Sequence, residues 1–145
     1  MVPKTVENLW VPVAVSASHL GFGTLRMEPC WMALGEAAGT AATLAIAIGL
    51  PARSVPIASL QRDLVAGGAM LVYFRDVPTA DPAFVALQFL GVRGAIPEWD
   101  ARLDDPATTA EWERWALIAG VAADLPAPDM SRRAALACLS GLLAK

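Results

Sequence analysis

Apolar residues dominate the first half of the chain, where they predict one strand close to the amino terminus. Residues 9–15 read Leu-Trp-Val-Pro-Val-Ala-Val, a nearly continuous apolar run. Short runs of this kind are typical of strands that are buried on both faces, although Pro12 has no N–H to donate to a neighbouring strand. We therefore expect a short strand here.

The segment after this run predicts a loop and then a long helix. Residues 16–27 contain two glycines and precede Pro29, which suits the first turn of a helix. We expect the helix to run from about Pro29 to Ile48 and to end at Gly49. Because it is rich in glycine and alanine and apolar nearly all the way round, it should be buried against a sheet or another helix.

Four shorter helices are predicted in the rest of the chain. The first covers residues 57–66, with Ile57, Leu60, Leu64 and Val65 on one face, and ends at Gly67-Gly68. The other three begin at Asp81-Pro82, at the capping-box pair Thr108 and Glu111, and after Ser131. The expected fold is therefore mainly α: one short N-terminal strand, a buried Gly/Ala-rich helix, and a small bundle of helices.

The charged residues are distributed unevenly along the chain and suggest two domains. Residues 1–68 hold eight charged side chains, whereas residues 69–145 hold seventeen. We expect the boundary near Gly67-Gly68, which gives domains at 1–68 and 69–145. Since 56% of all residues are hydrophobic and only 17% are charged, part of the apolar surface is expected to need a partner.

Several classes of function are poorly supported by composition. The net charge of −3 provides no basic footprint for nucleic acid. Cys30 and Cys138 lie far apart, and the single histidine, His19, cannot complete a common zinc site, so no metal site is expected. The start of the chain lacks the layout of a secretory signal, so the sequence assigns no localisation.

A membrane-spanning helix is the competing interpretation of the long apolar segment. Residues 29–50 approach the roughly 20 residues that a bilayer requires, and Gly35 and Gly39 form a small-x-x-x-small pair. Glu36 argues against a span, because an acid near the centre of a bilayer costs about 2.5 kcal/mol or more. We therefore expect no membrane insertion.

An ordered series of residues gives the chain a family resemblance. After the strand come Ser16-x-x-His19, then Arg26 and Pro29, and then a helix that contains Gly35-Glu-Ala-Ala-Gly39. This series resembles the last flavin-contacting motif of the FAD-dependent oxidoreductases that share the glutathione-reductase-type fold. The resemblance covers about residues 8–67.

The resemblance implies FAD as the cofactor and assigns roles to individual residues. A helix amino terminus would stabilise the negative charge of a reduced flavin near its N1 and C2 carbonyl. The implied cofactor-binding residues are Arg26, Met27, Glu28, Cys30 and Gly35, and the implied catalytic residues are His19 and Arg26. Two structural interpretations stay open, in which His19 caps a loop and Arg26 pairs with Glu28 or Glu36.

One part of the family pattern is missing from the chain. Its members hold the ADP half of FAD with a GxGxxG turn between a strand and a helix, and Gly21-Phe-Gly23 does not extend into such a pattern. We therefore expect the chain to be a C-terminal fragment that is inactive and colourless alone. Its partner would be the missing N-terminal FAD-binding portion, encoded directly upstream of Met1, and residues 9–48 should promote self-association.

The second half resembles the S-layer-homology-like tail found in some of these oxidoreductases. The matching stretches are Phe74-Arg-Asp-Val-Pro78, Asp81-Pro-Ala-Phe84, residues 86–90, residues 94–96 and, in part, Thr109-Ala-Glu111. The alternative hypothesis is accordingly a stand-alone helical module that binds a cell-surface polymer or a protein without catalysis. Trp99, Trp112 and Trp115 form either part of its core or a recognition surface.

Overall fold

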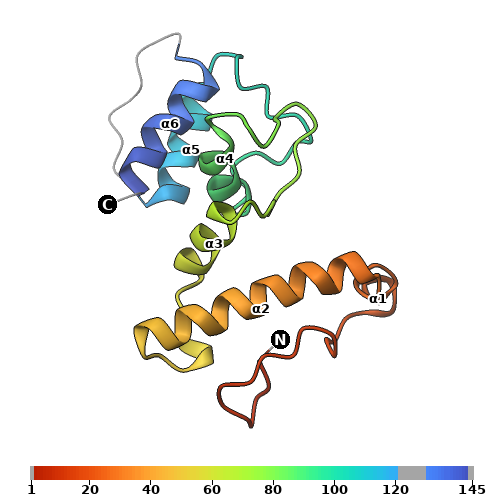
Figure 1. Ribbon diagram of the computed structural model, residues 1–145. Helices are drawn as coiled ribbons and strands as arrows, with labels where there is room; N and C mark the ends of the chain where they lie inside the picture. Colours follow the sequence, from red (N-terminus) through yellow and green to blue (C-terminus); the bar gives the residue numbers. More distant parts are fainter. Residues whose placement is uncertain (1, 121–129, 144–145) are drawn as a thin grey trace. The chain divides into compact units, whose positions relative to one another are not determined.

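The computed structural model describes residues 2–120 and 130–143 and divides the chain into two compact units, Met1–Gly67 and Gly68–Lys145. Unit 1 contains helices α1 (His19–Leu25), α2 (Glu28–Ile48) and α3 (Ile57–Ala66) and a 3₁₀ turn, η1 (Ala52–Ser54). Unit 2 contains α4 (Phe84–Gly91), α5 (Thr109–Ala119) and α6 (Arg132–Leu143). Figure 1 shows these elements in the order of the chain.

The strand predicted at residues 9–15 was wrong. These residues form an irregular segment, and the structured ranges 2–120 and 130–143 contain no strand, only an isolated bridge between Pro106 and Ser131. The N–H of Val15 bonds the carbonyl of Val13 at 2.9 Å, which bends the chain. A strand is stable only when a neighbour takes up its backbone hydrogen bonds, and within this part of the chain no neighbour is present.

The loop predicted at residues 16–27 also differs, because helix α1 occupies its centre. Ser18 is the N-cap of this helix, and its hydroxyl oxygen accepts a hydrogen bond from the N–H of Gly21 at 3.2 Å. Serine is a favoured cap because it satisfies an N–H of the first turn. The two glycines suggested a loop, but the cap and the helical hydrogen bonds outweigh their low helix propensity.

Helix α2 has nearly the predicted bounds but not the predicted burial. It ends where Gly49 adopts a left-handed conformation with a φ of 66°, the usual backbone of a helix C-cap. Only Ala38, Ala41 and Ala45 are buried, so the expectation of a buried helix was wrong. One side of α2 contacts α1, η1 and α3, and the sheet that would have covered more of it is absent from the described residues.

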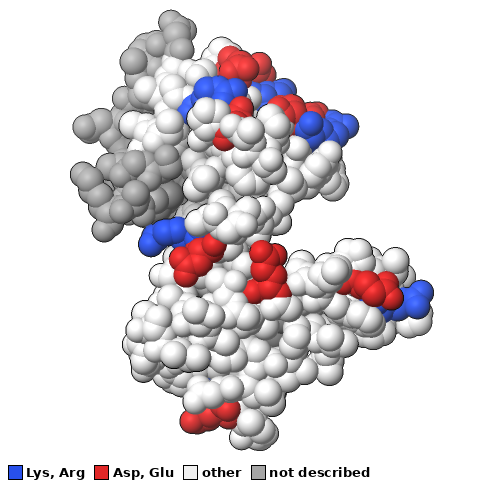
Figure 2. Space-filling model, in the orientation of Figure 1, with Lys and Arg blue, Asp and Glu red and all other residues white. Residues whose placement is uncertain are grey.

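Helix α2 is long and apolar enough to cross a bilayer. Among the described residues it is the one helix with this property. A core helix of a soluble protein passes the same test, so this property alone assigns no membrane role. In Figure 2 the visible face of unit 1 carries few charged side chains, in agreement with its composition.

Helix α3 packs on α2 through one face, as its amphipathic sequence predicts. Leu64 and Val65 are buried, whereas Ile57, at the start of the helix, is 62% exposed. Helix α3 therefore covers part of α2 and leaves the remainder of that helix open.

Unit 2 is a three-helix bundle in which α4, α5 and α6 contact one another. Its core is built from large side chains that are fully buried: Trp115, Leu87, Leu90, Leu136 and Leu139. The Nε1–H of Trp115 donates to the carbonyl of Ala95 at 2.8 Å, so the buried ring keeps a hydrogen bond. Trp112 is also buried, but Trp99 is 66% exposed, so only two of the three tryptophans serve the core.

Buried polar side chains fasten the long loops of unit 2 to its helices. Gln88 of α4 is 1% exposed, and its Oε1 accepts from the N–H groups of Leu71 and Val72 at 2.6 and 2.8 Å. Its Nε2 donates to the carbonyl of Val72 at 2.8 Å. Backbone groups that have no helix or sheet partner are thereby satisfied by one side chain.

Two arginines at the start of α6 tie this helix to the rest of unit 2. Arg132 is 7% exposed, forms an ion pair with Glu111, and donates to the carbonyl of Ala101 at 2.9 Å. Glu111 also completes the capping box with Thr108 that the sequence predicts. Arg133 pairs with Asp81 at 2.6 Å and with Asp104 at 3.1 Å, which joins α6 to two loops.

Candidate functional site

The residues assigned to flavin binding lie where α1 passes into α2. Arg26 is the C-cap of α1, and its N–H donates to the carbonyl of Phe22 at 3.0 Å. Met27 is the N-cap of α2, with an extended ψ of 137° and no hydrogen bond from its side chain. Arg26, Met27 and Glu28 are all exposed, so this junction is an open surface.

The first turn of α2 offers one free backbone donor. The N–H groups of Cys30 and Trp31 bond the carbonyl of Met27 at 3.0 and 3.3 Å, and Pro29 has no N–H. Among the described residues no acceptor is present for the N–H of Glu28. The positive end of the helix dipole and this single N–H are therefore what the backbone presents.

The structure gathers four of the six predicted site residues closely and sets the other two apart. Arg26, Met27, Glu28 and Cys30 share the junction, and Cys30 is half-buried there. Gly35 lies five residues beyond Cys30, about 7.5 Å further along α2 at 1.5 Å per residue.

His19 lies at the opposite end of α1 from Arg26, and its side chain is exposed. Seven positions separate the two residues, so they lie on nearly the same face of the helix, about 10 Å apart along its axis. A molecule about 10 Å long could contact both side chains. The alternative in which His19 caps a loop does not apply, because Ser18 supplies the N-cap and His19 is already helical.

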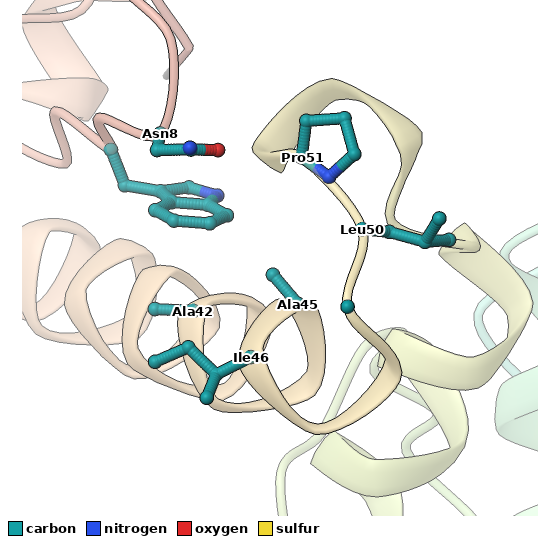
Figure 3. A pocket seen from close by; sticks show the side chains of 8 residues that line it. Asn8, Ala42, Ala45, Ile46, Leu50 and Pro51 are labelled. Atoms are coloured by element: carbon teal, nitrogen blue, oxygen red, sulfur yellow. The ribbon is translucent and has the colours of Figure 1, made fainter.

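The hollows of unit 1 lie away from this junction. One of about 620 Å³ is bounded by Asn8 and Trp10 on one side and by Ala42, Ala45 and Ile46 of α2 on the other. Figure 3 shows Asn8 on one side of this hollow and Ala42, Ala45 and Ile46 of α2 on the other. This hollow is mostly apolar, and the junction residues do not border it.

Asn8 and Trp10 position the amino-terminal segment, and sequence reasoning missed them. Asn8 has a left-handed φ of 56°, which asparagine tolerates better than most residues. Its Oδ1 accepts from the N–H of Ala52 at 3.1 Å and thus joins this segment to η1. The asparagine before an apolar run was the available signal, but its partner lies 44 positions away.

The junction has the kinds of group that can bind the negatively charged edge of a flavin. A helix amino terminus with one free N–H can stabilise an anionic oxygen, and the guanidinium of exposed Arg26 adds a positive charge at the same place. The carboxylate of Glu28 lies in the same first turn. It interacts favourably with the positive end of the helix dipole and therefore competes with an external anion for that end of the helix. Arg26 is therefore needed to make the junction attractive to an anion.

Comparison with known proteins supports the same cofactor class. The family model described as FAD dependent oxidoreductase matches residues 1–64. No curated protein and no solved structure matches the chain. Residues 1–64 are thus related to the FAD-dependent oxidoreductases, and FAD is the cofactor of that family.

Proposed function

We propose that unit 1 is the C-terminal segment of an FAD-dependent oxidoreductase of the glutathione-reductase type and that it completes the flavin pocket of a larger assembly. The observation that carries this proposal is the family match over residues 1–64. The exposed junction of α1 and α2 supports it, because a surface with an open helix terminus and a guanidinium suits contact with an anionic group from another polypeptide.

In this proposal the chain supplies charge and orientation at one edge of the cofactor. The flavin, when bound, supplies the hydride and electron chemistry. The Glu28 N–H and the α2 dipole would stabilise negative charge on a bound flavin, and Arg26 would hold an anionic oxygen of flavin or substrate. His19, on the same face of α1 as Arg26, would donate a proton to the substrate.

The dinucleotide-binding part must then come from elsewhere. Gly21 and Gly23 lie inside helix α1, so they cannot form the strand-to-helix turn that cradles a pyrophosphate. We propose that a polypeptide carrying a GxGxxG turn is the partner of unit 1 and that the chain is inactive without it.

Co-expression tests this function directly. The full chain is produced with and without the polypeptide encoded directly upstream of Met1, and flavin absorbance is measured in the purified material. We expect a colourless chain alone and a yellow complex after co-expression, with flavin content lowered by Arg26→Ala but not by Lys4→Ala, an exposed cation near the amino terminus. An upstream sequence without a GxGxxG turn, or a co-purified complex without flavin, would refute the proposal.

A second function is favoured for unit 2 by an exposed aromatic pair. Tyr73 and Trp99 are 55% and 66% exposed, and their ring centroids are 6.4 Å apart in an edge-on arrangement. Arg75 donates from Nε to Asp100 at 3.0 Å beside this pair. Exposed aromatic side chains are enriched at recognition surfaces, so we propose that this S-layer-homology-like unit binds a cell-surface polymer.

Sedimentation with purified cell-wall polysaccharide tests this second function on the full chain. Trp99→Ala should abolish co-sedimentation, and Leu117→Ala, which removes an 80% exposed residue of α5, should not. Equal binding by the two variants would remove the proposal.

A further inference from the structure

Two exposed aromatic rings of unit 2 meet at an angle on its surface. Tyr73 is 55% exposed and Trp99 is 66% exposed. Their ring centroids are 6.4 Å apart and the ring planes are inclined at 61°, so a flat molecule that lies on one ring meets the other ring at its edge. Neither ring belongs to the buried core, whereas Phe74, the residue after Tyr73, does.

Hydrogen bonds between two distant segments set the position of the rings. The N–H of Arg75 donates to the carbonyl of Trp99 at 2.9 Å. The carboxylate of Asp76 accepts from the N–H groups of Ala101 and Arg102 at 2.8 and 2.7 Å. The segment with Tyr73 is thereby fixed beside the segment with Trp99, although about 25 positions separate them.

The backbone before Tyr73 is fixed as well. Buried Gln88 accepts from the N–H of Val72 and donates to its carbonyl, both at 2.8 Å. A surface that is ordered before a ligand arrives loses little conformational freedom on binding. Because the two rings are held in place without being buried, their fixed arrangement indicates a role at the surface.

A bidentate ion pair adjoins the rings and gives them a polar edge. Arg75 donates from Nε to Oδ1 of Asp100 at 3.0 Å and from a terminal nitrogen to Oδ2. The two side chains are 61% and 39% exposed, so the remaining guanidinium N–H groups and carboxylate lone pairs stay available to a ligand. A hydroxyl group both donates and accepts, so neighbouring hydroxyls on one ligand match this pair.

The charges around the rings disfavour an anionic ligand. Residues 73–76 and 98–105 contain two arginines and five carboxylates. Arg75 is paired with Asp100, and Arg102 lies 3.9 Å from Asp105. The two segments therefore carry no excess of positive charge that would attract an anion. An apolar protein partner is disfavoured too, because it would desolvate the ion pair without replacing its contacts with water.

We propose that the aromatic corner, defined as Tyr73, Trp99, Arg75 and Asp100, binds a neutral polysaccharide through a pyranose unit with equatorial hydroxyls. The axial C–H bonds give such a unit an apolar face, which lies on the indole ring of Trp99. Tyr73 contacts the edge of the sugar, and two neighbouring hydroxyls bond to the ion pair. This inference rests on the second proposed function and names the class of polymer that unit 2 takes.

Titration calorimetry of the full chain with cellohexaose and with chitohexaose, two neutral oligosaccharides of such units, tests the ligand class. We expect saturable binding of at least one of them, with an affinity that changes less than about twofold between low and high salt, because no charge on the ligand is screened. Carboxymethylcellulose, which adds carboxylates to the same glucan backbone, should bind more weakly.

Substitution of Trp99 tests the stacking. Trp99→Ala should weaken binding at least about tenfold, and Trp99→Phe, which keeps an aromatic face, should stay within about threefold of wild type. The control Leu117→Ala, at an 80% exposed position of α5, should bind as wild type does. Because these side chains are exposed, all three variants should unfold close to the wild-type temperature.

Two substitutions in the ion pair separate hydrogen bonding from charge. Arg75→Lys keeps the charge but loses the bidentate geometry, and we expect binding about fivefold weaker. Asp100→Asn removes a negative charge and releases Arg75 from its ion pair. A neutral sugar should then bind about fivefold more weakly, whereas an anionic polymer would bind more tightly, and a gain in binding would overturn the inference.

The outcomes distinguish this inference from the function on which it rests. Suppose that cell-wall polysaccharide co-sediments with the chain through Trp99 while neither neutral hexamer binds. The inference then fails and the second proposed function stands. If neither the polysaccharide nor the hexamers bind, that function fails as well. A dimer in sedimentation velocity that Trp99→Ala dissociates would overturn both, because the rings would then form an interface between two copies of the chain.

Discussion

The buried amide of Gln88 provides a sharp test of how unit 2 holds its loops. Gln88→Leu keeps a side chain of similar volume but removes all three hydrogen bonds to Leu71 and Val72. Each bond contributes about 1 kcal/mol net, and a backbone group left without a partner costs about 1–3 kcal/mol. Because Leu71 and Val72 are half-buried, water can reach part of the lost site. We expect a loss of about 3 kcal/mol in the free energy of unfolding.

Thermal unfolding followed by near-ultraviolet circular dichroism measures this loss. For a unit of this size, about 3 kcal/mol corresponds to a midpoint roughly 10–20 °C lower. Hydrogen exchange at the amides of Leu71 and Val72 should accelerate more than exchange in α5. Val85→Ala, at a 55% exposed position of the same helix, serves as the control and should change stability by less than about 0.5 kcal/mol. A Gln88→Leu effect as small as that of the control would refute the structural role.

Three further outcomes are expected. Hydrogen bonds and ion pairs hold the carboxyl pKa values of Asp76, Asp81 and Glu111 below their ordinary range. A carboxyl group whose pKa is lower in the folded state stabilises the protein at any pH above its unfolded-state pKa of about 4. Unit 2 should therefore lose stability as the pH falls below about 4. Thermal unfolding midpoints that stay constant down to about pH 2 would contradict this. Gly49→Ala should destabilise the chain by about 1 kcal/mol in urea unfolding, because its φ of 66° strains any residue with a Cβ, whereas the control Gly39→Ala should be neutral or stabilising. Titration of the chain alone with FAD should leave the flavin fluorescence unchanged, and saturable quenching would show that the chain binds the cofactor without a partner.

The lowered pKa values have separate causes. Burial would raise the pKa of Asp76, but its carboxylate accepts from the N–H groups of Ala101 and Arg102 at 2.8 and 2.7 Å, and these bonds outweigh burial. For Asp81 the hydrogen bond from the N–H of Ala83 is the main cause, followed by Arg133. Burial likewise opposes the lowering at Glu111, where Thr108 and Arg132 stabilise the charged form. The acid sensitivity of unit 2 therefore arises from its loops and caps.

The order of residues along the sequence was enough to propose the candidate site, but it did not predict the geometry of that site. The order of Ser16, His19, Arg26 and Pro29 led to the flavin resemblance, and the match over residues 1–64 supports the FAD-dependent part of it. The sequence analysis did not predict that residues 19–25 are helical, which places His19 and Arg26 on one face. The two glycines in this segment favoured a loop, so Ser18 was not recognised as a helix N-cap. Gln88 and Arg132 were missed as polar core residues, since their partners lie 16 to 31 positions away.

Local chemistry let the sequence determine where most helices begin and end. The capping box of Thr108 and Glu111 and the stop at Gly49 depend on contacts within a few residues, so they are readable without a fold. Tertiary structure alone decided whether residues 9–15 form a strand and whether α2 is buried. Both outcomes depend on a second surface, for hydrogen bonds in one case and for apolar contact in the other. The described residues provide no neighbouring strand, and they cover only one side of α2.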